Sequence, residues 1–257
     1  MLMSMSVSIV NRNLNTILLS DDDCLMAHGF LVSFTGLDGA GKTTQARLLA
    51  GWLAGLGALS GVEAPDGPSP VRRVLTTLAG RAGLDDHMDL LGPDLTHLVT
   101  AFMRYRDWTE RVVPALDRPG VVVTDRAPAC HYAAARAVGA GNEDLLRGVL
   151  GLLPAPDLAI YLQVPPEYAY ARLAARGVGA ERLSYLAAND LGYRALPEFA
   201  GFVVVDGTRS VDAVHQDVRE QVIARWSARR AGVAPPRPAA AHSAAAAPGV
   251  ARPPAPG

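Results

Sequence analysis

The chain has 257 residues, of which 49% are hydrophobic, and a formal net charge of −1 at pH 7. This suffices for one α/β domain with a sizeable core, and the near-zero charge argues against a dedicated nucleic-acid binder or a polybasic membrane protein. Cys24 and Cys130 lack metal-ligand spacing and no apolar run reaches transmembrane length, so we expect a cytoplasmic protein with reduced cysteines that binds neither nucleic acid nor membrane.

The two ends of the chain differ from the part between them. Within residues 1–28, Asn11–Asn13 interrupt the apolar stretch and three aspartates follow it, which argues against a signal peptide. We expect this segment to be a disordered arm, or the natural start to be Met26. Residues 227–257 contain mostly Ala, Pro and Arg, which cannot bury a core, so we expect a disordered tail. The folded domain is then expected to span residues 29–226.

The first predicted elements surround a glycine-rich loop. Residues 30–35 are apolar strand formers, and residues 44–53 place apolar side chains at helical spacing. The intervening sequence Gly36-Leu-Asp-Gly-Ala-Gly-Lys-Thr43 matches Gly-x-x-x-x-Gly-Lys-[Ser/Thr], the phosphate-binding P-loop. A strand, a glycine loop and a helix are the context that this motif requires, so an incidental glycine-rich turn is the weaker interpretation.

Lys42 is the only lysine of the chain, and all other basic side chains are arginines. A compact ammonium group is needed between the β- and γ-phosphates of a nucleotide, where a planar guanidinium has a different shape. The Thr43 hydroxyl is the expected Mg²⁺ ligand. The sequence therefore predicts that ATP binds at Gly36, Leu37, Asp38, Gly39, Ala40, Gly41, Lys42, Thr43 and Thr44.

The remainder of the chain alternates strand-like and helix-like segments. Further strands are expected at residues 59–63, 121–124, 158–162 and 202–205. Helices are expected at residues 70–78, 95–116, 127–138, 143–153, 166–176, 184–196 and 211–226. This order predicts an α/β fold with a doubly wound, parallel, five-stranded sheet flanked by helices, of the P-loop NTPase type.

Asp125 and Arg126 directly follow the buried strand at residues 121–124. Ligands of such sheets bind at the carboxyl ends of the strands. An aspartate there can hold Mg²⁺ or orient an acceptor phosphate, and an arginine can grip an anionic substrate. The alternative is an ordinary charged pair at the end of a strand.

From about Phe30 to Trp226 the chain resembles the thymidylate kinases, a branch of the P-loop nucleoside monophosphate kinases. The resemblance is carried by residues 35–45, where Asp38 and Gln45 go beyond the generic P-loop, and by residues 112–116, 123–126, 156–167, 172–177 and 204–211. It implies transfer of the γ-phosphoryl group of ATP to thymidine monophosphate, with Mg²⁺, in a cytoplasmic homodimer packed through helices.

The resemblance also implies roles for individual residues. Asp38 lies beside the acceptor sugar and phosphate and acts in catalysis with Lys42. Arg104 and Arg126 grip the acceptor, Arg126 as a catalytic residue. Residues 177–190 form a mobile lid, and the loop that ends at Arg209 lies against adenine.

Position 39 carries glycine, and family members with glycine there supply arginines from the lid. Arg176 and Arg182 are the candidates, with Arg182 also expected in catalysis. The alternative for each is a solvated helix residue.

The chain departs from the family pattern in the expected acceptor pocket. Ala127, Ala134 and Thr100 stand where aromatic rings are usual. Tyr132 is offset by two positions, and Phe102 would replace the ring at position 100 only if the helix were shifted.

Three hypotheses follow from this pattern. The first is a thymidylate kinase, and the second is a related kinase for a modified pyrimidine or other nucleotide in a secondary pathway. The third is a nucleotide-binding regulatory protein with little turnover.

Overall fold

The computed structural model describes residues 29–63, 70–177 and 183–231. Five strands form one parallel sheet in the order β2-β3-β1-β4-β5. They are β1 (Phe30–Thr35), β2 (Leu59–Glu63), β3 (Val121–Thr124), β4 (Leu158–Gln163) and β5 (Val203–Asp206). The doubly wound, five-stranded parallel sheet that the sequence predicts is therefore confirmed.

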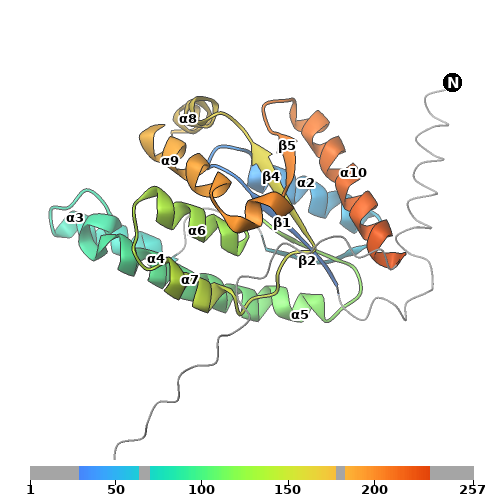
Figure 1. The fold of residues 1–257 in the computed structure, drawn as a ribbon, viewed down its shortest axis with the longest axis horizontal. Helices are drawn as coiled ribbons and strands as arrows, with labels where there is room; N and C mark the ends of the chain where they lie inside the picture. The colour runs from blue at the N-terminus through green and yellow to red at the C-terminus, as the bar shows by residue number, and fades with distance from the viewer. Residues whose placement is uncertain (1–28, 64–69, 178–182, 232–257) are drawn as a thin grey trace, which may run out of the picture.

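Helices cover both faces of this sheet (Figure 1). On one face α2 packs against α10, and on the other α6 packs against α4, α7 and α9. The α-helices are α2 (Lys42–Gly55), α3 (Pro70–Arg81), α4 (His87–Asp107), α5 (Val113–Leu116), α6 (Pro128–Ala137), α7 (Glu143–Leu150), α8 (Pro166–Ala175), α9 (Leu183–Arg194) and α10 (Val211–Arg230).

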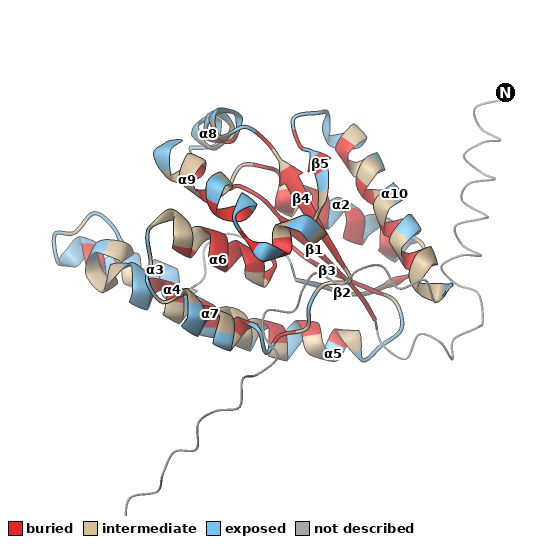
Figure 2. Ribbon diagram, in the orientation of Figure 1, coloured by how far each residue is buried: buried red, intermediate tan, exposed pale blue. Residues whose placement is uncertain are grey.

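The core lies between the sheet and these helices, and Figure 2 shows the central strands as buried. Every residue of β1 and β3 is buried, as expected for parallel strands covered on both faces. Aromatic rings fix the helices against the sheet: Phe30 meets Trp226 of α10 edge-on with ring centroids 5.2 Å apart. Tyr161 of β4 meets Tyr193 of α9 at the same separation.

The long helix expected at residues 95–116 differs from the prediction. It begins earlier, at His87, because the Asp86 side chain accepts hydrogen bonds from the backbone N–H groups of Met88 and Asp89. Gly92, with φ 72°, interrupts it just before Pro93, and residues 108–112 form a π-helical segment before α5. The prediction missed this start because apolar side chains at regular helical spacing are evident only after Pro93.

Candidate active site

The P-loop joins β1 to α2 and is pressed against two other elements. Gly36 and Gly39 have φ values of 128° and 88°, which side chains disfavour. A Cβ atom at Gly36 would lie 2.6 Å from the Leu162 carbonyl oxygen of β4, and one at Gly39 would lie 2.6 Å from the Ala169 carbonyl oxygen of α8. Glycine at both positions therefore lets the loop lie directly against β4 and α8.

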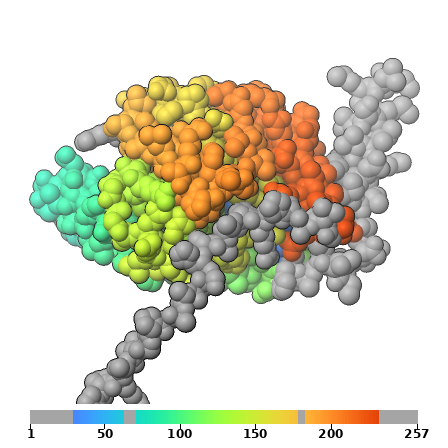
Figure 3. Space-filling view, viewed as in Figure 1, coloured from blue at the N-terminus to red at the C-terminus, as the bar shows by residue number. Residues whose placement is uncertain are grey.

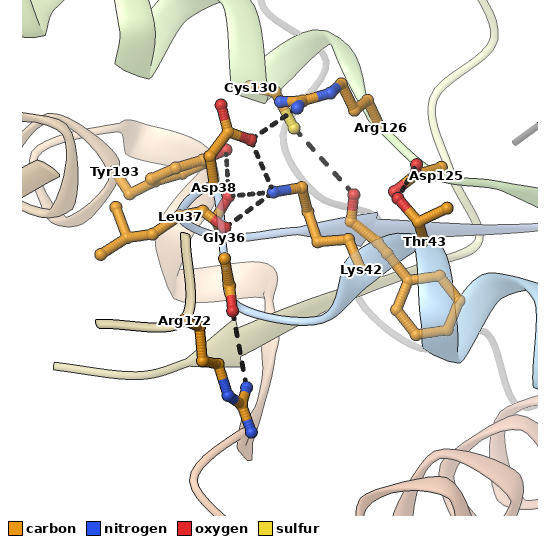
Figure 4. A network of polar contacts seen from close by, with 12 residues as sticks. Gly36, Leu37, Asp38, Lys42, Thr43, Asp125, Arg126, Cys130, Arg172 and Tyr193 are labelled. Atoms are coloured by element: carbon orange, nitrogen blue, oxygen red, sulfur yellow. Dashed lines mark hydrogen bonds and ion pairs between the residues drawn. The ribbon is translucent and has the colours of Figure 1, made fainter. Parts of the chain in front are cut away.

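Lys42 begins α2 and reaches back across this loop (Figure 4). Its Nζ atom donates hydrogen bonds to the carbonyl oxygens of Gly36 at 2.9 Å and Leu37 at 2.8 Å. It also contacts Asp38 Oδ1 at 3.2 Å. Only 5% of the side chain is exposed, so the loop itself holds the ammonium group in place. Tyr193 supports the same turn, because its hydroxyl donates to the Gly36 carbonyl oxygen at 3.2 Å.

Asp38 connects the P-loop to the end of β3. Arg126 Nη2 donates to Asp38 Oδ1 at 2.5 Å, on the same oxygen that Lys42 contacts. Burial by itself would raise the pKa of Asp38, but the charges of Arg126 and Lys42 outweigh it and hold that pKa well below its usual range. Three of the predicted catalytic residues therefore meet in one ionised cluster. They meet because β1 and β3 are parallel neighbours whose carboxyl ends share an edge.

Thr43 and Asp125, the two expected Mg²⁺ ligands, also lie together. The Thr43 hydroxyl donates to Asp125 Oδ2 at 2.6 Å. The other carboxylate oxygen, Asp125 Oδ1, is buried and has no hydrogen-bond partner among the described residues. A buried carboxylate oxygen is costly without a partner, and a hard divalent cation takes oxygen ligands of this kind. The pair therefore fits Mg²⁺.

Arg172 of α8 also adjoins the P-loop, although no site role was predicted for it. Its Nη1 atom lies 3.5 Å from the carbonyl oxygens of Gly39 and Ala40 and 3.3 Å from that of Gly207. Its guanidinium stacks over the Tyr168 ring, 4.4 Å from the centroid. The spacing of Tyr168 and Arg172, four residues apart on a helix that follows β4, was the available signal.

The remaining predicted residues of the ATP site are more dispersed. Thr44 is exposed in the first turn of α2, and Arg176 is exposed just after α8. Arg209 forms an ion pair with Asp217 of α10. Arg182 lies outside the described residues. Of the stretch expected to be a lid, residues 183–190 form the first part of α9.

The predicted acceptor residues divide into two groups. Burial, and then the charges of Arg104 of α4 and Arg126, lower the pKa of His131 of α6, as expected if both arginines lie on the side of the site where His131 is buried. Phe102 is 55% exposed, and Tyr132 is buried with the Arg147 guanidinium 4.3 Å from its ring centroid. These surroundings lend no support to acceptor-binding roles for Phe102 and Tyr132, which remain predictions.

Comparison with known proteins gives a consistent result. The family model described as thymidylate kinase matches residues 34–218. A thymidylate kinase of Xanthomonas oryzae pv. oryzae is 29% identical over 79% of this chain and 87% of that protein. One of Xanthomonas campestris pv. campestris is 31% identical over 78% and 86%, and a probable thymidylate kinase of Pyrococcus abyssi is 32% identical over 74% and 94%. The chain therefore belongs to the thymidylate kinase family.

Proposed function

We propose that this protein transfers the γ-phosphoryl group of ATP to thymidine monophosphate and forms thymidine diphosphate. Membership of the family supports this activity. The observation that carries it is the cluster in which Asp38 joins Lys42 of the P-loop to Arg126 at the end of β3. The cluster supports this proposal, because the cation proposed for the donor phosphates and the cation proposed for an acceptor phosphate both contact the same oxygen of one carboxylate.

The residues of this cluster suit phosphoryl transfer, which depends on positioning and on neutralising charge more than on covalent chemistry. Phosphates that enter the loop would replace the carbonyl oxygens of Gly36 and Leu37 as partners of Lys42. Arg126 would hold the acceptor phosphate, and Asp38 would orient Arg126. Thr43 and Asp125 would hold Mg²⁺, which when bound neutralises charge on the donor phosphates.

Additional positive charge has to come from outside the P-loop. A side chain at Gly39 would collide with the backbone of α8, so an arginine has no room at that position in this loop conformation. Arg172 already lies beside the loop. Arg176 and Arg182 are proposed to join it from the lid when substrate is bound, and closure would exclude water as a competing acceptor.

A modified or larger pyrimidine monophosphate is the second candidate acceptor. The small side chains of Ala127, just before α6, and of Ala134 on α6 favour it, because they are less bulky than the aromatic rings that are usual at these positions in the family. In this alternative the donor side and the chemistry are unchanged.

We also propose that the protein is a cytoplasmic homodimer. No helix in the described part of the chain is long and apolar enough to span a membrane. Helix α3 projects from one end of the molecule (Figures 1 and 3), and its Val71, Val74 and Leu78 are exposed on one helical face. Light scattering on the protein and on Val74→Asp tests this: a dimer that the substitution dissociates supports it, and a monomeric wild-type protein contradicts it.

The proposed activity is tested by incubating the full chain with ATP, Mg²⁺ and thymidine monophosphate. The account predicts ADP release that requires the acceptor and Mg²⁺, with thymidine diphosphate as the second product. A folded protein that binds ATP but releases no ADP with any nucleoside monophosphate would instead support a regulatory nucleotide-binding protein.

A further inference from the structure

Helix α6 presents an uneven face toward α4. His131 and Ala134 are three residues apart and lie along one side of this helix, and Ala127 directly precedes its first turn. Helix α4 packs against α6, and burial together with the charges of Arg104, Arg126 and His97 lowers the pKa of His131, as expected for a ring on the side of α6 that faces α4. The imidazole of His131 is therefore a buried polar side chain on the side of α6 that faces α4.

His131 is buried in a way that its protein surroundings do not satisfy. Its side chain is 8% exposed, and its Nε2 atom has no hydrogen-bond partner among the described residues. The neighbouring His97 is 7% exposed and has an unpartnered Nε2 by the same criterion. Because buried polar atoms in native proteins are nearly always hydrogen-bonded, these two ring nitrogens call for a partner that the described residues do not supply.

The electrostatic surroundings of His131 determine what kind of partner it can bind. Burial first, and then the charges of Arg104, Arg126 and His97, hold the pKa of His131 well below 6.5. The ring is therefore neutral near pH 7 and offers a hydrogen bond rather than a charge. In the proposed site Arg126 binds the acceptor phosphate. A neutral imidazole near Arg126 therefore suits an uncharged polar group of the acceptor.

We propose that His131 binds the nucleoside part of the acceptor through Nε2 and thereby helps to select the nucleotide that is phosphorylated. This proposal rests on the proposed kinase function. Arg126 extends from the end of β3 to Asp38 at the P-loop, and His131 follows it by five positions, one turn into α6. A nucleotide with its phosphate at Arg126 then directs its sugar and base along the α6 face that carries His131. The proposal requires that Nε2, which is buried in this structure, becomes accessible when the acceptor binds.

The group that His131 binds is either an edge of the base or a sugar hydroxyl, since both are neutral and hydrogen-bonding. The two sources are distinguished by acceptors that each alter one group. Deoxycytidine monophosphate changes the base edge, and dideoxythymidine monophosphate lacks the 3′-hydroxyl. If His131 binds one of these groups, the acceptor that lacks or alters that group has already lost the hydrogen bond. Removing the imidazole should then change the KM for that acceptor only slightly.

The test compares His131→Leu, which fills the space without a hydrogen bond, with His131→Gln, which keeps a polar group of similar reach. We expect His131→Leu to raise the acceptor KM about tenfold or more, from the loss of a buried hydrogen bond. The KM for ATP should stay within about twofold, and His131→Gln should recover most of the loss. His215→Leu is the matched control, because His215 of α10 also has an unpartnered ring nitrogen among the described residues but lies on the other face of the sheet.

An unchanged acceptor KM in a folded His131→Leu protein would overturn the proposal. So would equal losses in His131→Leu and His131→Gln, which would indicate a packing role. The wild-type protein is first assayed with all the acceptors, and the variants are then compared with the best one. If that acceptor is not thymidine monophosphate, the proposed thymidylate activity fails, while the His131 comparison is still decided with the acceptor found.

Discussion

The two sides of the active-site edge are built differently. On the donor side, close backbone contacts require glycine at two loop positions, and Lys42 contacts three oxygens of its own loop. On the acceptor side, α6 carries alanines around a buried histidine whose Nε2 has no partner among the described residues. We infer from this difference that the protein alone specifies the donor geometry, and we expect a substrate to complete the acceptor geometry.

The largest effect is expected from Lys42→Ala, which removes the central cation of the donor side. Transition-state charge is then uncompensated, so kcat should fall by about 10³-fold or more. The fold should persist, because Asp38 keeps its ion pair with Arg126. Steady-state ADP release and circular dichroism check this, and turnover within about tenfold of wild type in a folded variant would show that the loop is not a donor site.

Lys42→Arg is the matched variant for this position. It keeps the charge but replaces the compact ammonium by a planar group of different shape and hydrogen-bond geometry. We expect a loss of the same order as in Lys42→Ala. Near-normal activity would mean that charge alone, not shape, matters at position 42.

The substitution Arg126→Ala tests whether acceptor binding can be weakened without weakening ATP binding. The acceptor kcat/KM should fall by about 10²-fold, because a charged hydrogen bond to the acceptor phosphate is lost, while ATP affinity should scarcely change. Titration of ATP into the variant, with Arg106→Ala of the exposed α4 surface as control, checks this. An equal fall in ATP affinity would place Arg126 on the donor side.

Ala134→Tyr adds bulk to the α6 face. The ratio of kcat/KM for deoxyribose over ribose acceptors measures discrimination at the sugar. In the wild-type protein we expect this ratio to be about ten- to hundredfold smaller than in an enzyme with a tight sugar pocket, which corresponds to about 1.4–2.8 kcal/mol. The tyrosine should restore part of that selectivity. The ratio of kcat/KM for thymidine and ribothymidine monophosphates measures it, and an unchanged ratio would mean that position 134 does not face the sugar.

The smallest effect concerns stability and pH. The folded-state pKa of His131 lies below 6.5, so below about pH 6.5 the unfolded chain binds a proton that the folded protein does not, and stability falls as the pH decreases. The limiting slope is about 1.4 kcal/mol per pH unit for each such proton. Urea unfolding at several pH values should show a shallower dependence in His131→Gln. The same dependence in both proteins would mean that His131 is not held neutral.

Much of the fold could be predicted because its signals are local. The apolar strands and the P-loop are each contained within a few consecutive residues, and the pairing of β1 with β3 follows from the alternation of strands and helices. The helical residues before Gly92 were missed because a glycine and a proline just ahead of residue 95 resemble an ordinary helix start. The extension of α10 four residues past Trp226, to Arg230, was missed because arginine and alanine dominate both the helix end and the tail.

The site was predictable in part for the same reason. Lys42, Thr43 and Asp125 belong to short motifs at strand ends, and the structure brings them together as expected. Arg172 and Tyr193 were missed because their contacts with the P-loop depend on how α8 and α9 pack. The His97 and His131 pair has no sequence signal, since two isolated histidines 34 positions apart become neighbours only through the packing of α4 on α6.

The central claim is that a complete donor side is combined with a permissive acceptor side. It is tested most directly by measuring kcat/KM of the wild-type protein for thymidine, ribothymidine, deoxyuridine and deoxycytidine monophosphates at saturating ATP. The account predicts turnover, with thymidine monophosphate best and its ribose form within about a hundredfold. Exclusive use of thymidine monophosphate, or a folded protein that turns over none of the four, would contradict it.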